Sequence, residues 1–293
     1  MKTSINILLV FLFAACTSVP DERMTPYVDF PETRELTART LSLDSALFRY
    51  PYRVRVQDDK AVVLDLHGTE YFFHAFHYPG FHYLSSFGKR GDAPEEMLSA
   101  ENLRWNGNFL WTLDSNKSEL TRLGFASSGD SLLRLEAVSL DEELLRALDF
   151  VQYDDSTFII PDYSGDSRFC LVSRQGKLLH KIGTIPTTDE DALKNAHPAL
   201  AQAWRSFIDY NPRNGVLAAV TQLGEVLEIY NLKDSTHIVR IGPNGEPEFQ
   251  ISQGYGIPTG IMGFSDIQVT DSAIYVVFQG RAFKDIMQKA QQG

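Results

Sequence analysis

Three aspartates recur at nearly equal spacing along the chain. Asp65, Asp114 and Asp162 lie 49 and 48 residues apart, and each follows a short apolar run. If the three carboxylates converge, they form a ring able to bind a divalent cation or an amine, because carboxylate oxygens suit hard cations. Alternatively, each accepts backbone N–H bonds in its own turn, which needs no ligand. These three are the candidate ligand-binding residues, a divalent cation is the one cofactor considered, and no catalytic residue is identified.

Four histidines gather within a short stretch, at His67, His74, His77 and His82. A zinc site needs three or four ligands that converge on one point. His74 and His77 are three residues apart on a predicted strand, so they face opposite sides and cannot bind one metal together. The sequence predicts no metal site here. We expect the aromatic residues around these histidines to pack between neighbouring sheets.

The N-terminus carries the features of a lipidation signal. Lys2 precedes the apolar run Ile5–Ala15, which is too short to span a bilayer and matches the core of a signal peptide. The run leads directly into Cys16, and this junction resembles the lipobox of bacterial lipoproteins, whose cysteine is acylated. We therefore expect a signal peptide over 1–15, a lipidated tether over 16–26 and a folded domain over 27–293. The domain would be lipid-anchored to the cell envelope, at the outer membrane.

Charge and cysteine content restrict the partners. The net charge of −11 argues against nucleic acid, whose phosphates repel an acidic protein. If Cys16 is acylated, Cys170 has no disulfide partner, and its apolar surroundings predict a small buried hydrophobic residue. We expect a monomer that binds a small molecule, glycan, peptide or protein.

Short β-rich runs with a two-residue period repeat from Leu36 onward, bounded by turns rich in Asn, Asp and Gly. Markers in these turns are 48, 48, 59 and 57 residues apart, at Asp59, Gly107, Asp155, Asn214 and Asp271. Four antiparallel strands in about 48 residues is the repeat of a propeller blade. The sequence therefore predicts an all-β fold, a β-propeller of four-stranded antiparallel blades, with a β-sandwich as the alternative.

A second repeat lies where each blade crosses to the next. Phe87-Gly88, Ile182-Gly183 and Ile241-Gly242 each end a predicted fourth strand, and two of them continue alike, as FGKRGDAPEEM and IGPNGEPEF. With these segments the chain resembles the NHL-like and TolB-like six-bladed propellers, and especially TolB-like propeller lipoproteins of Gram-negative gut bacteria. The resemblance implies six blades. It is partial, since Ala93 and Glu95 replace two glycines of the family pattern.

The two longer spacings contain insertions between blades. We expect a surface helix over Asp189–Trp204 with Leu193, Leu200 and Trp204 on one side, packed on the propeller mouth or a blade. We expect a Gly/Pro-rich loop over Gly242–Gly263. Connections between blades share one end of a propeller, here called the crossover face, and tight hairpin turns share the other, the hairpin face. Irregular loops on a rigid scaffold commonly carry binding residues, so the crossover face is the expected binding face.

The strand count is short of six blades. Four blades end by residue 241, and two further strands follow near 264–278, before a polar and helix-like C-terminus. The count predicts a propeller lacking its last one to one and a half blades, about 60 residues, by C-terminal truncation or in a natural short form. Leu36–Leu43 is expected to supply the outer strand that closes the ring. The alternative is a five-bladed ring closed by the same segment.

Motifs of common hydrolases are missing from the sequence, which has no G-x-S-x-G, no H-E-x-x-H and no Walker-type loop. This favours a binding or interaction module that acts through the crossover face without catalysis. The competing hypothesis is a metal-dependent, lactonase-like hydrolase that uses Asp65, Asp114 and Asp162 at the propeller mouth.

Overall fold

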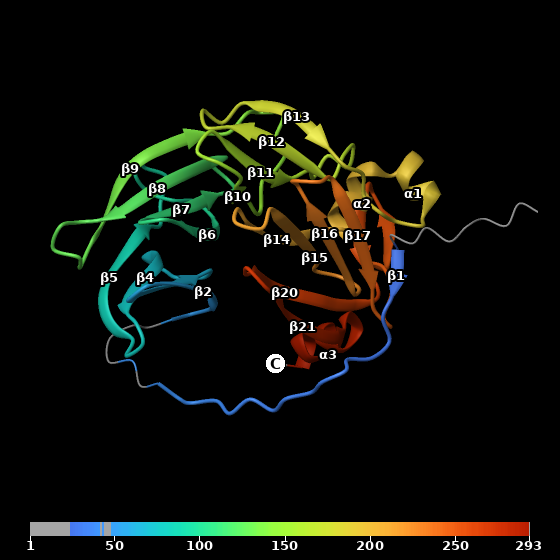
Figure 1. Cartoon of the computed structure of the whole chain (residues 1–293), viewed down its shortest axis with the longest axis horizontal. Helices are drawn as coiled ribbons and strands as arrows, with labels where there is room; N and C mark the ends of the chain where they lie inside the picture. The colour runs from blue at the N-terminus through green and yellow to red at the C-terminus, as the bar shows by residue number, and fades with distance from the viewer. Residues whose placement is uncertain (1–23, 42, 44–47, 293) are drawn as a thin grey trace, which may run out of the picture.

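The computed structural model describes residues 24–41, 43 and 48–292. Four antiparallel four-stranded sheets form successive blades around a common centre, with the first strand of each blade innermost (Figure 1). Blade 1 consists of β2 (Pro51–Gln57), β3 (Lys60–Asp65), β4 (Tyr71–His77) and β5 (His82–Lys89). Blade 2 consists of β6 (Ala100–Asn106), β7 (Phe109–Asp114), β8 (Glu119–Phe125) and β9 (Leu132–Ser139). Blade 3 consists of β10 (Val151–Gln152), β11 (Thr157–Pro161), β12 (Phe169–Ser173) and β13 (Leu178–Ile182).

Blade 4 carries an additional strand at its outer edge. It consists of β14 (Ser206–Asn211), β15 (Val216–Thr221), β16 (Val226–Asn231) and β17 (Thr236–Ile241). The short strand β1 (Met24–Pro26) pairs with β17 in parallel. The predicted all-β propeller of four-stranded antiparallel blades is therefore confirmed.

A fifth sheet has two strands, β20 (Ile261–Val269) and β21 (Ile274–Ala282), followed by helix α3 (Phe283–Gln292). The predicted strand pair and the helical character of the C-terminal segment are confirmed. The expectation for Leu36–Leu43 was wrong, because its described residues 36–41 and 43 form no strand. Instead, 27–41 runs along the periphery from β1 towards blade 1 (Figure 1). Leu36, 94% exposed, has no sheet against which to pack.

The insertion between blades 3 and 4 folds as two short helices, α1 (Glu190–Asn195) and α2 (His197–Ala203), instead of the single helix predicted. Pro198, in the first turn of α2, has no N–H and clashes with a continuous helix before it. Leu200 and Trp204 are buried against blade 4 with Leu193 beside them, which confirms their predicted packing. The later Gly/Pro-rich segment includes a hairpin, β18 (Phe249–Ser252) and β19 (Tyr255–Pro258).

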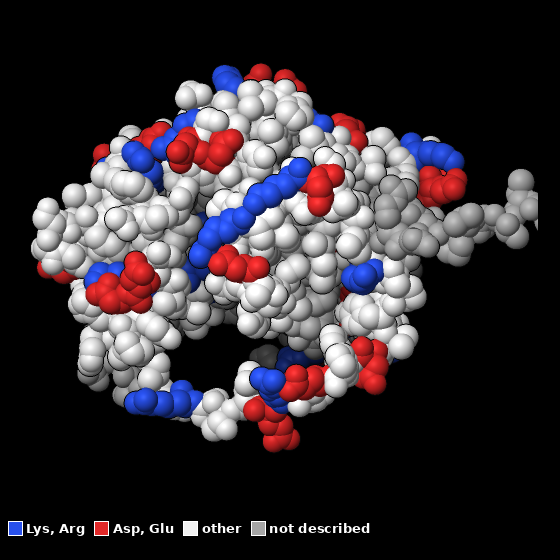
Figure 2. Space-filling model, viewed as in Figure 1, with Lys and Arg blue, Asp and Glu red and all other residues white. Residues whose placement is uncertain are grey.

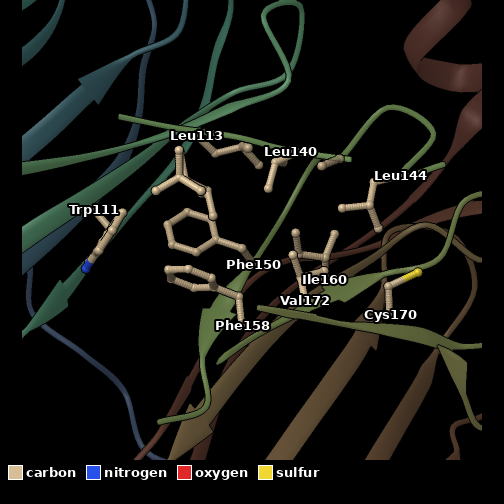
Figure 3. Packing of buried hydrophobic residues seen from close by; sticks show 12 residues of the cluster. Trp111, Leu113, Leu140, Leu144, Phe150, Phe158, Ile160, Cys170 and Val172 are labelled. Atoms are coloured by element: carbon tan, nitrogen blue, oxygen red, sulfur yellow. The ribbon is translucent and has the colours of Figure 1, made fainter. Parts of the chain in front are cut away.

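The core lies between neighbouring sheets, since each of the four blades buries both faces of its second strand. Between blades 2 and 3, Trp111 and Leu113 pack against Phe150, Phe158 and other residues of one apolar cluster (Figure 3). Phe72 and Phe73 belong to the corresponding cluster between blades 1 and 2, so the predicted inter-blade packing is confirmed for these two rings, whereas it was wrong for Tyr78 and Tyr83, which are exposed. The described part of the chain contains no helix long and apolar enough to cross a membrane.

The Phe-Gly step that ends blade 1 has a conformational cause. Gly88 has φ of +64°, and a Cβ there would lie 2.6 Å from the ring of Phe73. Only glycine adopts this backbone without strain. Gly88 thus allows the chain to leave β5 close to the inter-blade core.

Candidate functional site

The three predicted aspartates lie at the crossover end of their blades, each bound to backbone N–H groups of its own blade or of the segment leading into it. Asp65 ends β3 and accepts hydrogen bonds from the backbone N–H groups of Arg49 (2.8 Å) and Tyr50 (2.7 Å). Asp114 ends β7 and accepts from four backbone N–H groups, those of Leu98, Ser99, Asn116 and Lys117. Both residues are buried. Asp65 and Asp114 therefore fasten the segment that enters the blade, through Arg49 and Tyr50 or Leu98 and Ser99, to the end of the second strand.

Asp162 of blade 3 differs, because its backbone donors lie within its own loop. It accepts hydrogen bonds from the N–H groups of Ser164 (3.0 Å) and Ser167 (3.1 Å), and Lys181 Nζ lies 3.1 Å from its Oδ2. No contact joins the three aspartates to one another. Within residues 24–41, 43 and 48–292, no group of three or more His, Cys, Asp or Glu side chains is arranged to hold a metal ion.

The remaining sequence candidates lie outside any common site. His74 donates to or accepts from Ser86 Oγ at 2.7 Å, whereas His77 lies on the other side of the strand near Asp59, so the opposite orientation is confirmed. Cys170 is buried and free, and burial raises the pKa of its thiol to about 12. Cys16 lies outside the described residues.

A belt of paired charges, which the sequence analysis did not identify, surrounds the propeller axis on the first strands. Arg104 of β6 is its centre: Nη2 donates to both carboxylate oxygens of Asp149 (3.0 and 3.3 Å), and Nη1 donates to Asp209 of β14 at 2.6 Å. Burial lowers the pKa of Arg104, but the charges of Asp149 and Asp209 outweigh it and raise the pKa. Blades 2, 3 and 4 are therefore joined at the axis by one guanidinium.

The same belt joins the fifth sheet to blade 1. Arg55 of β2 donates to both oxygens of Asp266 on β20, at 2.7 and 2.8 Å. Burial raises the pKa of Asp266, but the hydrogen bond from Arg55 and the charges of Arg53 and Arg55 hold it below its usual range. Arg53 Nη1 donates to Asn102 of β6 at 2.6 Å, and Asn102 in turn donates to Asp149. All five first strands, or the residues beside them, thus contribute to the belt, defined here as Arg53, Arg55, Asn102, Arg104, Asp149, Asp209 and Asp266.

A cavity of about 700 Å³ opens beside this belt, here called the axial cavity. Its lining comes from the ends of the first strands and the turns that follow them, in all five sheets. β2 pairs with β3 so that Asp65 is opposite Pro51, while the cavity lies at the other end, near Gln57. The axial cavity is therefore on the hairpin face, opposite the crossover face on which the sequence analysis placed the binding site.

The cavity wall combines aromatic and polar side chains. Trp105, Tyr153 and Tyr210 line it and remain partly exposed, and the rings of Tyr153 and Tyr210 lie 5.4 Å apart. Burial raises the pKa of Tyr210, so its hydroxyl is neutral and available as donor and acceptor near neutral pH. A rigid wall of this kind can bind an organic ligand through ring contacts and hydrogen bonds.

The sequence did contain a signal for the belt. Arg53 and Arg55 alternate in a strand-like run, and charged residues occur in the first strands of other blades, such as Asp209 and Asp266. Period-two alternation places Arg53 and Arg55 on the same side of β2. The belt becomes apparent only when the first strands of different blades are compared. The three aspartates, in contrast, end second strands or follow them.

A family model and several solved structures match this chain. A family model described as TolB-like 6-blade propeller-like matches residues 29–293. None of the curated proteins matches the sequence. Among solved structures, a Bacteroides fragilis NCTC 9343 protein assigned as exported has a TM-score of 0.55 at 12% identity, with 88% of this chain and 75% of that chain covered.

Two further structures are more distant. A functionally unknown protein from Desulfotomaculum acetoxidans DSM 771 has a TM-score of 0.40 at 13% identity, covering 63% of this chain and 53% of its own. A member of the DUF4221 family from Bacteroides vulgatus ATCC 8482 has a TM-score of 0.46 at 12% identity, covering 78% of this chain and 67% of its own. At these identities the likeness of the first structure concerns the fold alone.

Proposed function

The chain belongs to the TolB-like 6-blade propeller-like family, and from this premise we propose that it is an extracytoplasmic binding module that takes its ligand into the axial cavity. The observation that carries the proposal is the cavity of about 700 Å³, to which all five sheets contribute. Its volume falls in the range of small-molecule sites, about 300–1,000 Å³. The belt of paired charges holds the strand ends in place, so the cavity is formed before a ligand arrives.

The belt orders the wall of the axial cavity before a ligand binds. Arg104 and Asp149 are almost fully buried. Their mutual hydrogen bonds tie β6 to the residues before β10, and the bond from Arg104 to Asp209 ties β6 to β14. A ligand that enters a site already ordered loses less free energy to the ordering of loops and side chains. Binding at the cavity therefore requires no rearrangement of the blades.

The proposal is tested by thermal unfolding with a panel of small molecules of differing chemistry, each at 1 mM. A ligand that binds only the folded state stabilises it by about 2.7 kcal/mol at one hundred times its Kd, which raises Tm. Gln268→Phe places a ring at the exposed, cavity-lining position of β20 and should abolish the rise. Gln250→Phe, on the exposed part of the β18–β19 hairpin outside the cavity, should preserve it. A rise that persists in Gln268→Phe, or no rise with any compound, would contradict the proposal.

Membrane attachment forms the second half of the proposal. The apolar run before Cys16 and the lipobox-like junction support acylation of Cys16, and each buried CH₂ of an acyl chain contributes about 0.8 kcal/mol to membrane binding. Cys16→Ser in the full chain should abolish palmitate labelling and move the protein from the membrane to the soluble fraction. Membrane fractionation unchanged by the substitution, with no label on the wild type, would show that the protein is not a lipoprotein.

A further inference from the structure

We propose that the axial cavity binds a neutral saccharide of one or two rings. The inference rests on the proposed function, because it names the ligand class of the same cavity. Three features of the lining carry it: the pairing of its arginines, the unpaired amides at its wall, and its aromatic rings.

The arginines of the cavity leave no free cation for an anionic ligand. Both Nη atoms of Arg55 are bound to Asp266, and Arg104 is bound to Asp149 and Asp209. At the rim, Arg213 Nη1 lies 3.0 Å from Asp271. At Arg55 and Arg104, a carboxylate or phosphate would have to compete with Asp266, Asp149 and Asp209, at a cost in largely buried ion pairing. A ligand without net charge meets no such competition.

Unpaired amide groups match hydroxyls. Gln57, Asn106 and Gln268 line the cavity, and their side chains make no hydrogen bond to any other residue in the described part of the chain. Each amide offers one acceptor oxygen and two N–H donors. In addition, Gln152 donates through Nε2 to the carbonyl of Asp154, while its Oε1 is buried without a partner. Hydroxyl groups both donate and accept, so a polyhydroxylated ligand can satisfy such a wall.

The aromatic rings complement the apolar faces of sugar rings. Trp105 and the Tyr153–Tyr210 pair are partly exposed at the cavity, and the two tyrosine rings are inclined at 47°. A pyranose presents C–H groups on its ring faces and hydroxyls on its edge. Aromatic surface facing the former and amides facing the latter is the combination of contacts that a neutral sugar requires.

The test compares sugars that share a ring and differ in charge. Saturation-transfer NMR on the whole protein would measure N-acetylglucosamine and glucose, which are neutral, with glucosamine as the cation and glucuronate as the anion. We expect the neutral sugars to bind and glucuronate to bind at least tenfold more weakly. Tyr210→Ala and Gln268→Ala should each weaken binding at least threefold. Tyr255→Ala, at an exposed ring outside the cavity, is the matched control and should leave binding unchanged.

Other outcomes separate this inference from the proposed function. Because Tyr210 also packs against the core between blades 3 and 4, the exposed Gln268 keeps the test valid if Tyr210→Ala misfolds. Tighter binding of glucosamine or glucuronate than of the neutral sugars would overturn the ligand class and leave the binding cavity in place. The same follows if no sugar binds but another compound raises Tm in a manner that Gln268→Phe abolishes. If neither sugars nor any other compound binds, both proposals are wrong.

Discussion

Strands β15 and β21 hold the same position in their sheets, second from the axis, but differ in burial. The residues of β15 from Leu217 to Thr221 are all buried, since β14 and β16 flank it and neighbouring sheets cover its faces. β21 pairs with β20 alone, and its side chains from Tyr275 to Arg281 are exposed. Both strands are rich in Val and other β-forming residues. Local sequence therefore determines strand formation, whereas burial depends on neighbours that lie far away in the sequence.

Contacts near the propeller axis join the two-stranded fifth sheet to the complete blades. Although the fifth sheet has only two strands, Asp266 joins it to blade 1 through Arg55, and Asp209 accepts a hydrogen bond from the backbone N–H of Val269. On the surface, charges of both signs are interspersed, and residues 27–41 leave an opening between themselves and the rest of the molecule (Figure 2). The two-stranded sheet is thus connected to the complete blades through its first strand, β20, which also packs against β14 and β15 of blade 4.

The largest expected effect comes from breaking the belt. Arg104→Ala leaves the buried Asp149 and the partly buried Asp209 without their cation. It should lower the free energy of unfolding by about 4 kcal/mol, since removing one partner of a buried ion pair costs about 3–5 kcal/mol. Arg213→Ala is the control, because its pair with Asp271 is exposed and should contribute less than about 1 kcal/mol. Urea unfolding measures both, and equal effects of the two substitutions would refute a special role for the axis.

The comparison of β15 with β21 is tested by trimming one apolar side chain in each. Leu217→Ala, at a fully buried position, should lower the free energy of unfolding by about 3 kcal/mol through lost burial and a residual cavity. Val277→Ala, at a position 56% exposed, should change it by less than about 0.5 kcal/mol. A loss at Val277 as large as that at Leu217 would show that further structure covers β21 in solution.

Much of this architecture could be predicted from the sequence, because each blade is encoded locally. The turn residues Asp59 and Gly107 and the alternating strands beside them indicate hairpins without knowledge of distant contacts. The strand predicted over Leu36–Leu43 failed because the pairing of an N-terminal segment depends on where the ring places its edges. The parallel contact of β1 with β17 joins residues more than 200 positions apart, which no local pattern specifies.

The site was less predictable for a related reason. Asp65, Asp114 and Asp162 repeat with the blade period, and each accepts backbone hydrogen bonds at the crossover end of its blade, whereas blade 4 has Thr221 at the equivalent position. The belt residues differ from blade to blade, since Arg104 must meet Asp149 and Asp209 across the axis. Residues that complement one another across a ring share no common sequence pattern.

The smallest effect concerns pH and the link between the fifth sheet and blade 1. Asp266 has a folded-state pKa below its unfolded value, near 3.9, so its charged form stabilises the fold above about pH 4. This contribution declines as the pH falls from about 4 towards the folded pKa, because the unfolded state binds the proton first. Asp266→Asn should remove that part of the acid dependence of stability, measured by urea unfolding between pH 3 and pH 7. An unchanged pH profile in the variant would contradict the ion pair with Arg55.

We propose that the first strands of all five propeller sheets build a ligand site on the hairpin face. A crystal structure of the protein soaked with N-acetylglucosamine tests this proposal. We expect electron density for the sugar ring in the axial cavity, against Tyr210 and within hydrogen-bonding distance of Gln268. Density on the crossover face beside Asp65, Asp114 or Asp162, with the axial cavity free of sugar, would contradict it.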